Sequence, residues 1–428
     1  MKIKEEFLHF IWRHAMFNSR ELSDEQGQII TIVDRGIYNT NAGPDFLEAK
    51  VKIGNELWAG SVEFHMKPSD WFHHKHHFDE RYDNVILHVV YSCNGEDEII
   101  KKLNIPTLTL KGLIPKIYLT NYLKLKFEKG KLPCSSYVKG MDRSLLNIYY
   151  ESLLVSRFEY KVSSITQLYK ENNYDLAETI YQTLALAWGL KVNKLAFLTL
   201  ARRVPFKLVR KNGLSRNKIE AIYFGQAGLL PEEEDKDVTI NTWQKDYDHI
   251  KRLYALESME KREWYFHKLR PRAFPTIRIS LWSKFMFMVP DLGGFISDFT
   301  LKESSLLLGN LDVSSYWRSH YMFGVSSISG NKKLGANGIR NVLINAIIPL
   351  KLFLSRLNSI NQDVWDSILF ELPKLKPENN QITRKMESNG FNNFNVSNSQ
   401  AILHLHQTYC ISKKCLNCRI GNEIMRRK

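Results

Sequence analysis

The sequence lacks the features that mark secreted proteins. Its five cysteines are too few for a disulfide framework in a chain of 428 residues. The N-terminus lacks the unbroken apolar core of a signal peptide, because it contains Lys2, Lys4, Glu5 and Glu6. We therefore expect a reducing compartment, by default the cytoplasm.

Long hydrophobic runs are missing as well. The longest mostly apolar run is 342–354, and it contains Asn345 and Lys351. A helix needs about 20 consecutive apolar residues to cross a bilayer. The sequence thus predicts no membrane association.

Acidic residues are outnumbered by basic ones, 45 against 60, which leaves a formal net charge of +15. Clustered cations bind polyanions by releasing condensed counterions. The surplus favours a nucleic acid as partner, although a solvated basic surface produces the same count. The basic residues of the predicted helical region that would contact phosphates are Arg202, Arg203, Lys207, Arg210, Lys211, Arg270, Arg272 and Arg278.

Periodicity predicts an α+β protein of two or three domains. Alternating and apolar runs predict a first α/β domain over residues 1–140, with a helix over 4–17 and strands over 28–33, 46–53, 56–67 and 84–91. Helical spacing predicts a helical domain over 141–378. Asn-rich residues from 379 to 398 predict a flexible connection to a cysteine-containing tail, which together make up 379–428.

The most informative stretch is Asn41-Ala42-Gly43-Pro44-Asp45 and the hairpin that follows it. Side chains on a strand alternate between faces, so Glu63, His65 and Lys67 would point the same way beside Asp45. Two carboxylates on adjacent strands can bind Mg²⁺ or Mn²⁺ through oxygen ligands. A neighbouring basic group would activate the attacking water. Alternatively, these residues are the solvated face of a one-sided sheet.

This pattern resembles the PD-(D/E)xK nuclease superfamily over residues 1–95. Pro44-Asp45 matches its first element, and Glu63-Phe64-His65 matches its acid-x-Lys triplet with His in place of Lys. The resemblance implies a restriction-endonuclease-like fold, with Asp45, Glu63 and the Phe64 carbonyl as metal ligands. It also implies an acid from the first helix, either Glu5 or Glu6. In place of the lysine, His65 would act as a base and Lys67 would supply the positive charge, or the site has lost its activity.

A longer set of segments is similar to an uncharacterised bacterial family known as a domain of unknown function. It runs from Phe7-Leu8-His9-Phe10-Ile11-Trp12 through Trp58-Ala59-Gly60-Ser61 to Ser69-Asp70-Trp71. This resemblance implies membership of a family without implying an activity.

Six of the 13 histidines lie between His65 and His88. The sequence favours a solvated loop for His73, His74, His76 and His77. His88 interrupts an apolar run, which favours a core histidine with a satisfied hydrogen bond.

The tail carries Cys410, Cys415 and Cys418 in nine residues, a spacing that predicts a metal site. His406, four residues before Cys410, would complete a Cys₃His zinc site. Cys134 would instead complete a four-thiolate site for zinc or an iron–sulfur cluster. The remaining alternative is three unliganded cysteines.

Together these features predict a divalent-metal-dependent nuclease that acts on DNA or RNA, with Asp45, Glu63, His65 and Lys67 as its catalytic residues. A nucleic-acid-binding protein that retains the fold without the chemistry is the alternative. A third class, a metal-stapled scaffold for another protein, predicts no salt-sensitive binding of polyanions.

Overall fold

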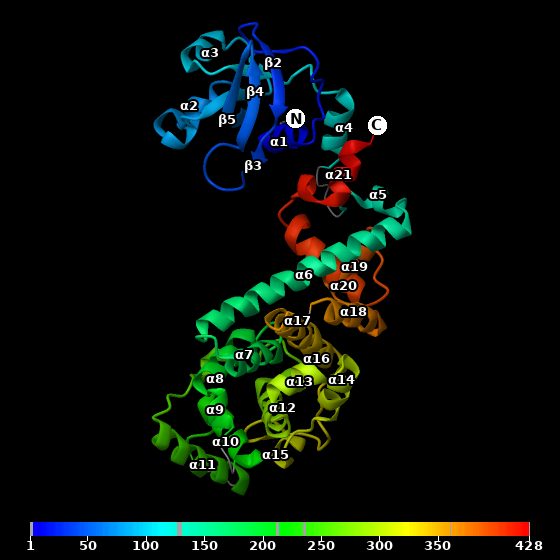
Figure 1. Ribbon diagram of the computed structural model, residues 1–428. Coiled ribbons are helices and arrows are strands. Elements are labelled where there is room, and N and C mark those ends of the chain that lie inside the picture. Colours follow the sequence, from blue (N-terminus) through cyan, green and yellow to red (C-terminus); the bar gives the residue numbers. More distant parts are fainter. Residues whose placement is uncertain (1–2, 126–130, 211–213, 234–236, 360, 428) are drawn as a thin grey trace. The chain divides into compact units, whose positions relative to one another are not determined.

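The computed structural model describes residues 3–125, 131–210, 214–233, 237–359 and 361–427. It confirms a mixed α+β protein with an N-terminal sheet and a mainly helical remainder (Figure 1). The chain divides into two compact units, each built from separate stretches of sequence. Unit 1 contains residues 1–153, 378–393 and 401–428, and unit 2 contains residues 154–377 and 394–400. The tail thus belongs to unit 1 and is not a separate part after the helical region.

The first helix of unit 1, α1 (Glu5–Arg13), forms where the apolar stripe predicted it. Phe7, Leu8, Ile11 and Trp12 are all fully buried. The Trp12 indole N–H donates a hydrogen bond of 3.0 Å to the carbonyl of Arg35. This bond fixes the helix against the loop that precedes the central strands.

The sheet of unit 1 has the order β1-β2-β4-β5-β6-β7, with β3 paired to β4. Strands β2, β3, β4 and β5 are labelled in Figure 1. Strands β2, β4 and β5 run antiparallel, whereas β6 is parallel to both β5 and β7. The strands are β1 (Leu22–Ser23), β2 (Ile29–Asp34), β3 (Ile37–Tyr38), β4 (Phe46–Ile53), β5 (Glu56–His65), β6 (Val85–Val90) and β7 (Thr107–Thr109).

The hairpin between β4 and β5 turns at Gly54 and Asn55, as predicted, with Ile53 opposite Glu56. Phe46 lies opposite Val62, so Phe46, Val62 and Phe64 share the face that α1 covers. The Phe64 ring lies 5.3 Å from that of Phe46 and 5.4 Å from that of Trp12. The odd-numbered residues of β5 therefore face the other way.

Strand β5 approaches β6 closely at Gly60. A Cβ atom there would overlap the carbonyl oxygen of Asn84 and the side chain of Ile86. The N–H of Ser61 donates to that same carbonyl at 2.9 Å. Glycine at this position therefore lets the strand that carries Glu63 pair with the buried strand β6.

The remaining elements of unit 1 are short helices and turns, and the last of them form the tail. They are α2 (Asp70–His73), η1 (His76–Phe78), η2 (Glu80–Tyr82), α3 (Asp97–Leu103), α4 (Lys116–Lys124), α5 (Ser135–Lys139), α19 (Gln381–Ser388), the π-helical turn η7 (His406–Cys410), η8 (Cys415–Asn417) and α21 (Arg419–Arg426).

The Asn-rich segment is not the flexible connection that its composition predicted. Residues 381–388 form α19, and the side chain of Asn380 caps it by accepting from the N–H groups of Ile382 and Thr383, both at 3.0 Å. The Asn389 side chain accepts from the N–H of Leu132 at 2.9 Å. Asparagine caps helices well, so a high content of it does not by itself indicate disorder.

Unit 2 is helical apart from one short hairpin, and α6 and α20 each contain a unit boundary. Its elements are α6 (Arg143–Glu171), α7 (Leu176–Trp188), α8 (Lys194–Arg203), α9 (Phe206–Val209), α10 (Arg216–Gln226), α11 (Val238–Tyr254), η3 (Lys261–Glu263), η4 (Pro271–Ala273), α12 (Pro275–Met288), α13 (Leu292–Asp298), α14 (Leu301–Asn310), α15 (Ser315–Arg318), β8 (His320–Met322), β9 (Val325–Ser326), α16 (Ala336–Val342), the π-helical turn η5 (Leu343–Ile347), α17 (Ile348–Leu357), α18 (Asn361–Glu371), η6 (Leu372–Lys374) and α20 (Val396–Leu405).

One continuous helix of unit 2, Ala336–Leu357, is long and apolar enough to cross a membrane by length and composition. It extends beyond the run 342–354 on which the sequence prediction rested. Of its most apolar window, 61% is buried inside the protein, and Val342 and Leu350 are fully buried. The core helix of a globular unit passes the same test.

Candidate metal centre

Asp45 and Glu63 are held beside each other by two hydrogen bonds across β4 and β5. The N–H of Asp45 donates to Glu63 Oε2 at 3.0 Å, and the N–H of Phe64 donates to Asp45 Oδ2 at 3.1 Å. Asn39 fixes the approach to β4, because its side-chain amide donates to the Pro44 carbonyl at 2.9 Å. The two predicted carboxylates therefore converge at the start of β4.

Glu63 is buried, with 5% of its surface exposed, and His65 is fully buried. The alternative of a solvated outer face is therefore wrong for these two residues. Burial raises the pKa of the Glu63 carboxyl, and the neighbouring Asp45 carboxylate raises it further. A bound cation would remove both effects, since it would compensate the two negative charges.

Two imidazoles approach these carboxylates without making hydrogen bonds to them. His9 Nε2 lies 3.0 Å from Asp45 Oδ2, and His76 Nε2 lies 3.3 Å from Glu63 Oε1. Both nitrogens are buried and have no hydrogen-bond partner among the described residues. Neighbouring ligands of one ion, with bonds of about 2.1 Å at right angles, lie about 3 Å apart. Each of the two nitrogen–oxygen distances is thus close to that between neighbouring ligands of one ion.

His65 and His74 lie close to the same carboxylates and imidazoles. The ligand nitrogens of His65, His74 and His76 all lie within 4.8 Å of one another. His65 Nε2 lies 3.1 Å from His74 Nδ1 and 3.9 Å from Glu63 Oε1. We name Asp45, Glu63, His9, His65, His74 and His76 the His-carboxylate cluster.

His88 orients the central imidazole of the cluster. Its Nε2 lies 2.9 Å from His65 Nδ1. With the shared proton on His65 Nδ1, the Nε2 lone pair of His65 faces the cluster, which is the usual arrangement of a metal-binding histidine. The prediction of a core histidine is confirmed for His88, which is fully buried; its Nε2 has a hydrogen-bond partner, whereas its Nδ1 has none among the described residues.

Burial keeps His65 and His88 neutral. It lowers the pKa of His65 to about 2, with His88 adding to the effect, and it lowers the pKa of His88 to about 3. Burial also lowers the pKa of His76. Neutral imidazole is the form that binds metal ions.

The prediction of a solvated loop is confirmed for His73, His74 and His77, which are exposed, and it was wrong for His76, which is half-buried. Lys75, between His74 and His76, adopts a left-handed conformation with φ of 62°. The chain reverses here, and the rings of both neighbours lie close to the His65 ring on β5, at 4.9 and 5.2 Å between ring centres. Sequence composition carried no signal for it.

His9 is the residue that the sequence reasoning missed. It lies one helical turn after Glu5, so both share a face of α1. Burial raises the pKa of Glu5, which also interacts electrostatically with His74, Asp45 and His9. Glu6 instead accepts a hydrogen bond of 3.3 Å from the Tyr122 hydroxyl. Of the two candidate helix acids, Glu5 is therefore the one beside the cluster.

Lys67 does not continue the face formed by Glu63 and His65. Strand β5 ends at His65, and Lys67 is exposed. Its backbone N–H donates to Asp70 Oδ2 at 3.1 Å, in the turn that leads to α2. The strand therefore ends two residues before Lys67, and the alternation of side chains that would place Lys67 beside the carboxylates does not reach it.

The predicted cysteine ligands also come together, at a second place in unit 1. Cys134, Cys410, Cys415 and Cys418 line one cavity. His406 is not among the described residues that line it. All four cysteines are free thiols.

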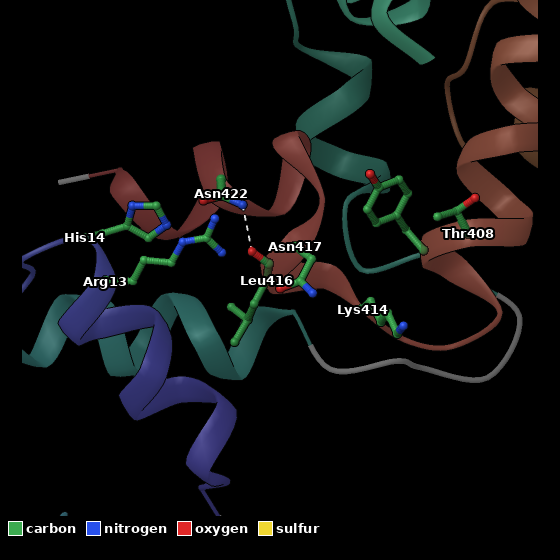
Figure 2. A pocket seen from close by; sticks show the side chains of 8 residues that line it. Arg13, His14, Thr408, Lys414, Leu416, Asn417 and Asn422 are labelled. Carbon is green, nitrogen blue, oxygen red and sulfur yellow. Dashed lines mark hydrogen bonds between the residues drawn. The ribbon is translucent and has the colours of Figure 1, made fainter. Parts of the chain in front are cut away.

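A basic cavity of about 370 Å³ lies between the end of α1 and the tail (Figure 2). The Asn422 side chain donates to the Leu416 carbonyl at 2.7 Å within its wall. Burial and the charges of Arg426, Arg13 and Arg35 lower the pKa of His14 to about 4. The cavity is lined by Arg13, His14, Thr408, Tyr409, Lys414, Leu416, Asn417 and Asn422.

Tyr38 connects the basic cavity to the His-carboxylate cluster. The Arg13 guanidinium lies 5.6 Å from the centre of the Tyr38 ring, and the His9 ring lies 5.7 Å from it.

Comparison with known proteins identifies one family. Residues 5–381 match the model of a family described as "Protein of unknown function (DUF2851)". The chain belongs to this family. The match contains every residue of the His-carboxylate cluster and ends before Cys410. No curated protein and no solved structure matches the chain.

Proposed function

We propose that unit 1 is a divalent-metal-dependent nuclease that hydrolyses phosphodiester bonds in DNA or RNA. The observation that carries the proposal is the convergence of Asp45 and Glu63 with the imidazoles of His9, His65 and His76. A buried and a half-buried carboxylate with imidazole nitrogens 3.0 and 3.3 Å away are a donor set for a metal ion. Such sets are common in enzymes that activate water.

The donor set favours Mn²⁺ over Mg²⁺, the other ion expected from the carboxylates. Mg²⁺ prefers oxygen ligands and retains several waters, whereas imidazole nitrogen binds Mn²⁺ and later transition metals more strongly. The two carboxylates alone would provide only oxygen ligands. His9, His76 and His65 add nitrogen ligands to them. We therefore propose Mn²⁺ as the ion that supports activity best.

The arrangement of strands agrees with the resemblance to the PD-(D/E)xK nucleases. Pro44-Asp45 leads into β4, Glu63 lies on the antiparallel neighbour β5, and Glu5 comes from the preceding helix. Strand β6 then returns parallel to β5. These positions support the proposal, with His65 where that superfamily has lysine.

A divalent cation bound here would supply Lewis acidity for hydrolysis of the phosphodiester. Asp45 and Glu63 would hold it through their carboxylates. Burial lowers the pKa of His65 to about 2, so its Nε2 is neutral but only weakly basic, and we assign it to holding the ion and not to accepting the proton of the water. His88 fixes the orientation of the His65 ring through the bond to Nδ1.

The positive charge of the missing lysine must come from elsewhere. Arg13 and Lys414 line the basic cavity, and both are available to contact a phosphate there. The basic residues expected in the helical region are a weaker source. Arg278 is buried, and its Nε donates to the Trp188 carbonyl at 2.9 Å, while Lys211 lies outside the described residues.

The test is cleavage of end-labelled single- and double-stranded DNA and RNA by the full chain. We expect turnover that requires a divalent ion, with Mn²⁺ more effective than Mg²⁺. Asp45→Asn and Glu63→Gln should abolish it and leave binding of nucleic acid largely intact. Glu56→Gln is the matched control, since Glu56 is an exposed carboxylate on the same strand. Cleavage that persists in both site variants would refute the proposal.

The alternative is a nucleic-acid-binding protein without chemistry, favoured by His65 in place of lysine. It predicts binding that weakens steeply with salt and no turnover with any divalent ion. A protein-binding scaffold predicts neither turnover nor salt-sensitive binding. One assay series therefore separates the three classes.

A further inference from the structure

Four cysteines from two distant parts of the sequence face the same cavity. Cys134 directly precedes α5, and the other three lie at 410, 415 and 418, in the tail. The rest of the cavity wall is mainly apolar and consists of Leu125, Leu132, Pro133, Phe391, Leu405, Tyr409, Ile420 and Gly421.

Contacts outside the cavity hold these segments together. The Asn121 side chain on α4 donates to the Arg427 carbonyl at 2.8 Å, beyond the end of α21. The N–H of Leu132 donates to the Asn389 side chain at 2.9 Å. The meeting of Cys134 with the tail is therefore supported by bonds on both sides of it.

The approach of α21 to the cysteine turn requires glycine. A Cβ atom at Gly421 would overlap the carbonyl oxygen of Cys415. The N–H of Cys418 donates to that same carbonyl at 3.1 Å, which closes the turn between the two cysteines. The chain is thus shaped to present Cys415 and Cys418 from one tight turn.

His406 does not join the cysteines because of the local helix geometry. Residues 406–410 form a π-helical turn. A π-turn is wider than an α-turn, so residues four apart no longer lie directly above one another. The spacing that favoured His406 in the sequence therefore does not bring it to the cavity, and Cys134 takes the fourth position.

We propose that Cys134, Cys410, Cys415 and Cys418 bind an iron–sulfur cluster through four thiolates. Soft sulfur donors that converge on an apolar cavity are ligands for such clusters or for zinc. Free, unlinked thiols in this number are otherwise unexplained in unit 1.

The spacing of the sulfurs distinguishes the two metal centres. Zinc with four Zn–S bonds of about 2.3 Å would draw the sulfurs to about 3.8 Å from one another. Among the described residues, the group of three or more donor atoms within 4.8 Å of one another is His65, His74 and His76, and the cysteines do not form one. The sulfurs therefore do not lie at the separations that a single zinc ion would impose.

The cluster would also fix one wall of the basic cavity. Lys414 and Asn417 lie in the segment between Cys410 and Cys418 and point into that cavity, and Tyr409 lines both cavities (Figure 2). Binding of the cluster therefore determines where these polar groups stand.

The test is metal analysis of the full chain purified without oxygen. We expect about four irons and about four acid-labile sulfides per chain, as in a cubane cluster, together with broad visible absorption. Cys134→Ser and Cys418→Ser should each lose most of the iron. Cys93→Ser and His406→Ala are the matched controls and should retain it, since neither residue lines the cavity.

A second measurement guards against variants that fail to fold. The wild-type chain is stripped of metal with a chelator and an oxidant, and then reconstituted with ferrous iron and sulfide. We expect the visible absorption to return in the wild type, and far-ultraviolet circular dichroism to confirm that each variant keeps its helices. A chain without iron that also fails to take it up would overturn the proposal. One zinc per chain, or iron that survives Cys134→Ser, would overturn it equally.

Discussion

Asp45 and Glu63 bind each other's strand: the N–H of Asp45 donates to the Glu63 carboxylate, while the Asp45 carboxylate accepts from the N–H of Phe64. This exchange holds the buried Glu63 carboxylate beside the half-buried Asp45 carboxylate. The nearest imidazole nitrogens, on His9 and His76, have no hydrogen-bond partner among the described residues. The local structure therefore leaves both carboxylate and imidazole donors available to one cation.

The first prediction concerns Glu63 and alkaline pH. Burial raises the pKa of Glu63 to about 9 in the folded chain, so above about pH 4.5 the folded state holds a proton that the unfolded state releases. Stability of the metal-free protein should then fall as pH rises toward about 9, by at most roughly 1.4 kcal/mol per pH unit. Thermal unfolding in a chelator between pH 7 and 9 should show this slope. It should flatten in Glu63→Gln, and an unchanged slope in that variant would contradict the assignment.

The second prediction concerns acid. The pKa values of His65 and His88 are lowered in the folded chain, so below about pH 6.5 the unfolded state binds protons that the folded state does not. Stability should therefore fall as pH drops from about 6.5 toward 4. His88→Gln should reduce this loss, as measured by urea unfolding at several pH values. His77→Gln, at an exposed position, should leave it unchanged.

The third prediction concerns which ion binds. His76→Gln should weaken Mn²⁺ binding by at least about tenfold and affect Mg²⁺ binding less, because imidazole distinguishes the two ions. Isothermal titration of chelator-treated protein measures both affinities. His73→Gln is the control, since its ring is exposed. Equal loss for the two ions would argue against nitrogen ligation.

The fourth prediction concerns the basic cavity. Arg13→Ala and Lys414→Ala should each weaken nucleic-acid binding at all sequences and lower the salt slope of log K by about one. Lys50→Ala is the control, an exposed cation on β4. Fluorescence anisotropy across a salt series measures the slopes. If the salt slope of log K were unchanged in both Arg13→Ala and Lys414→Ala, the basic cavity would not be part of the nucleic-acid-binding surface.

The fifth prediction concerns Gly60. An added methyl group would collide with the Asn84 carbonyl, so Gly60→Ala should cost about 1–3 kcal/mol of unfolding free energy. Chemical denaturation measures this cost. Gly330→Ala, where nothing lies within 4 Å of the added Cβ, should change stability little. Similar effects at the two positions would mean that β5 and β6 do not approach as closely as described.

Local patterns in the sequence predicted much of unit 1 correctly. The apolar stripe predicted α1, and alternation with the Gly54-Asn55 turn predicted the hairpin of β4 and β5. The two strand carboxylates followed from the same alternation. These features depend on neighbouring residues, which a single sequence displays directly.

The other parts of the site depend on contacts between distant segments. His9 reaches Asp45 because α1 packs on the sheet, and His76 reaches Glu63 because Lys75 reverses the chain. Neither the packing of α1 on the sheet nor the chain reversal at Lys75 produces a periodic pattern in the sequence. Lys67 was misplaced for the converse reason, since alternation does not indicate where β5 ends. The prediction of a flexible connection over residues 379–398 was wrong because asparagine is common both in loops and at helix caps.

The central claim is that Asp45 and Glu63, with the imidazoles around them, bind a divalent cation. Titration of Mn²⁺ into chelator-treated full chain, followed by the loss of its free electron paramagnetic resonance signal, tests this directly. We expect saturable binding in the wild type and in Glu56→Gln, and loss of that binding in the double variant Asp45→Asn, Glu63→Gln. Binding of equal strength in the folded double variant would contradict the claim.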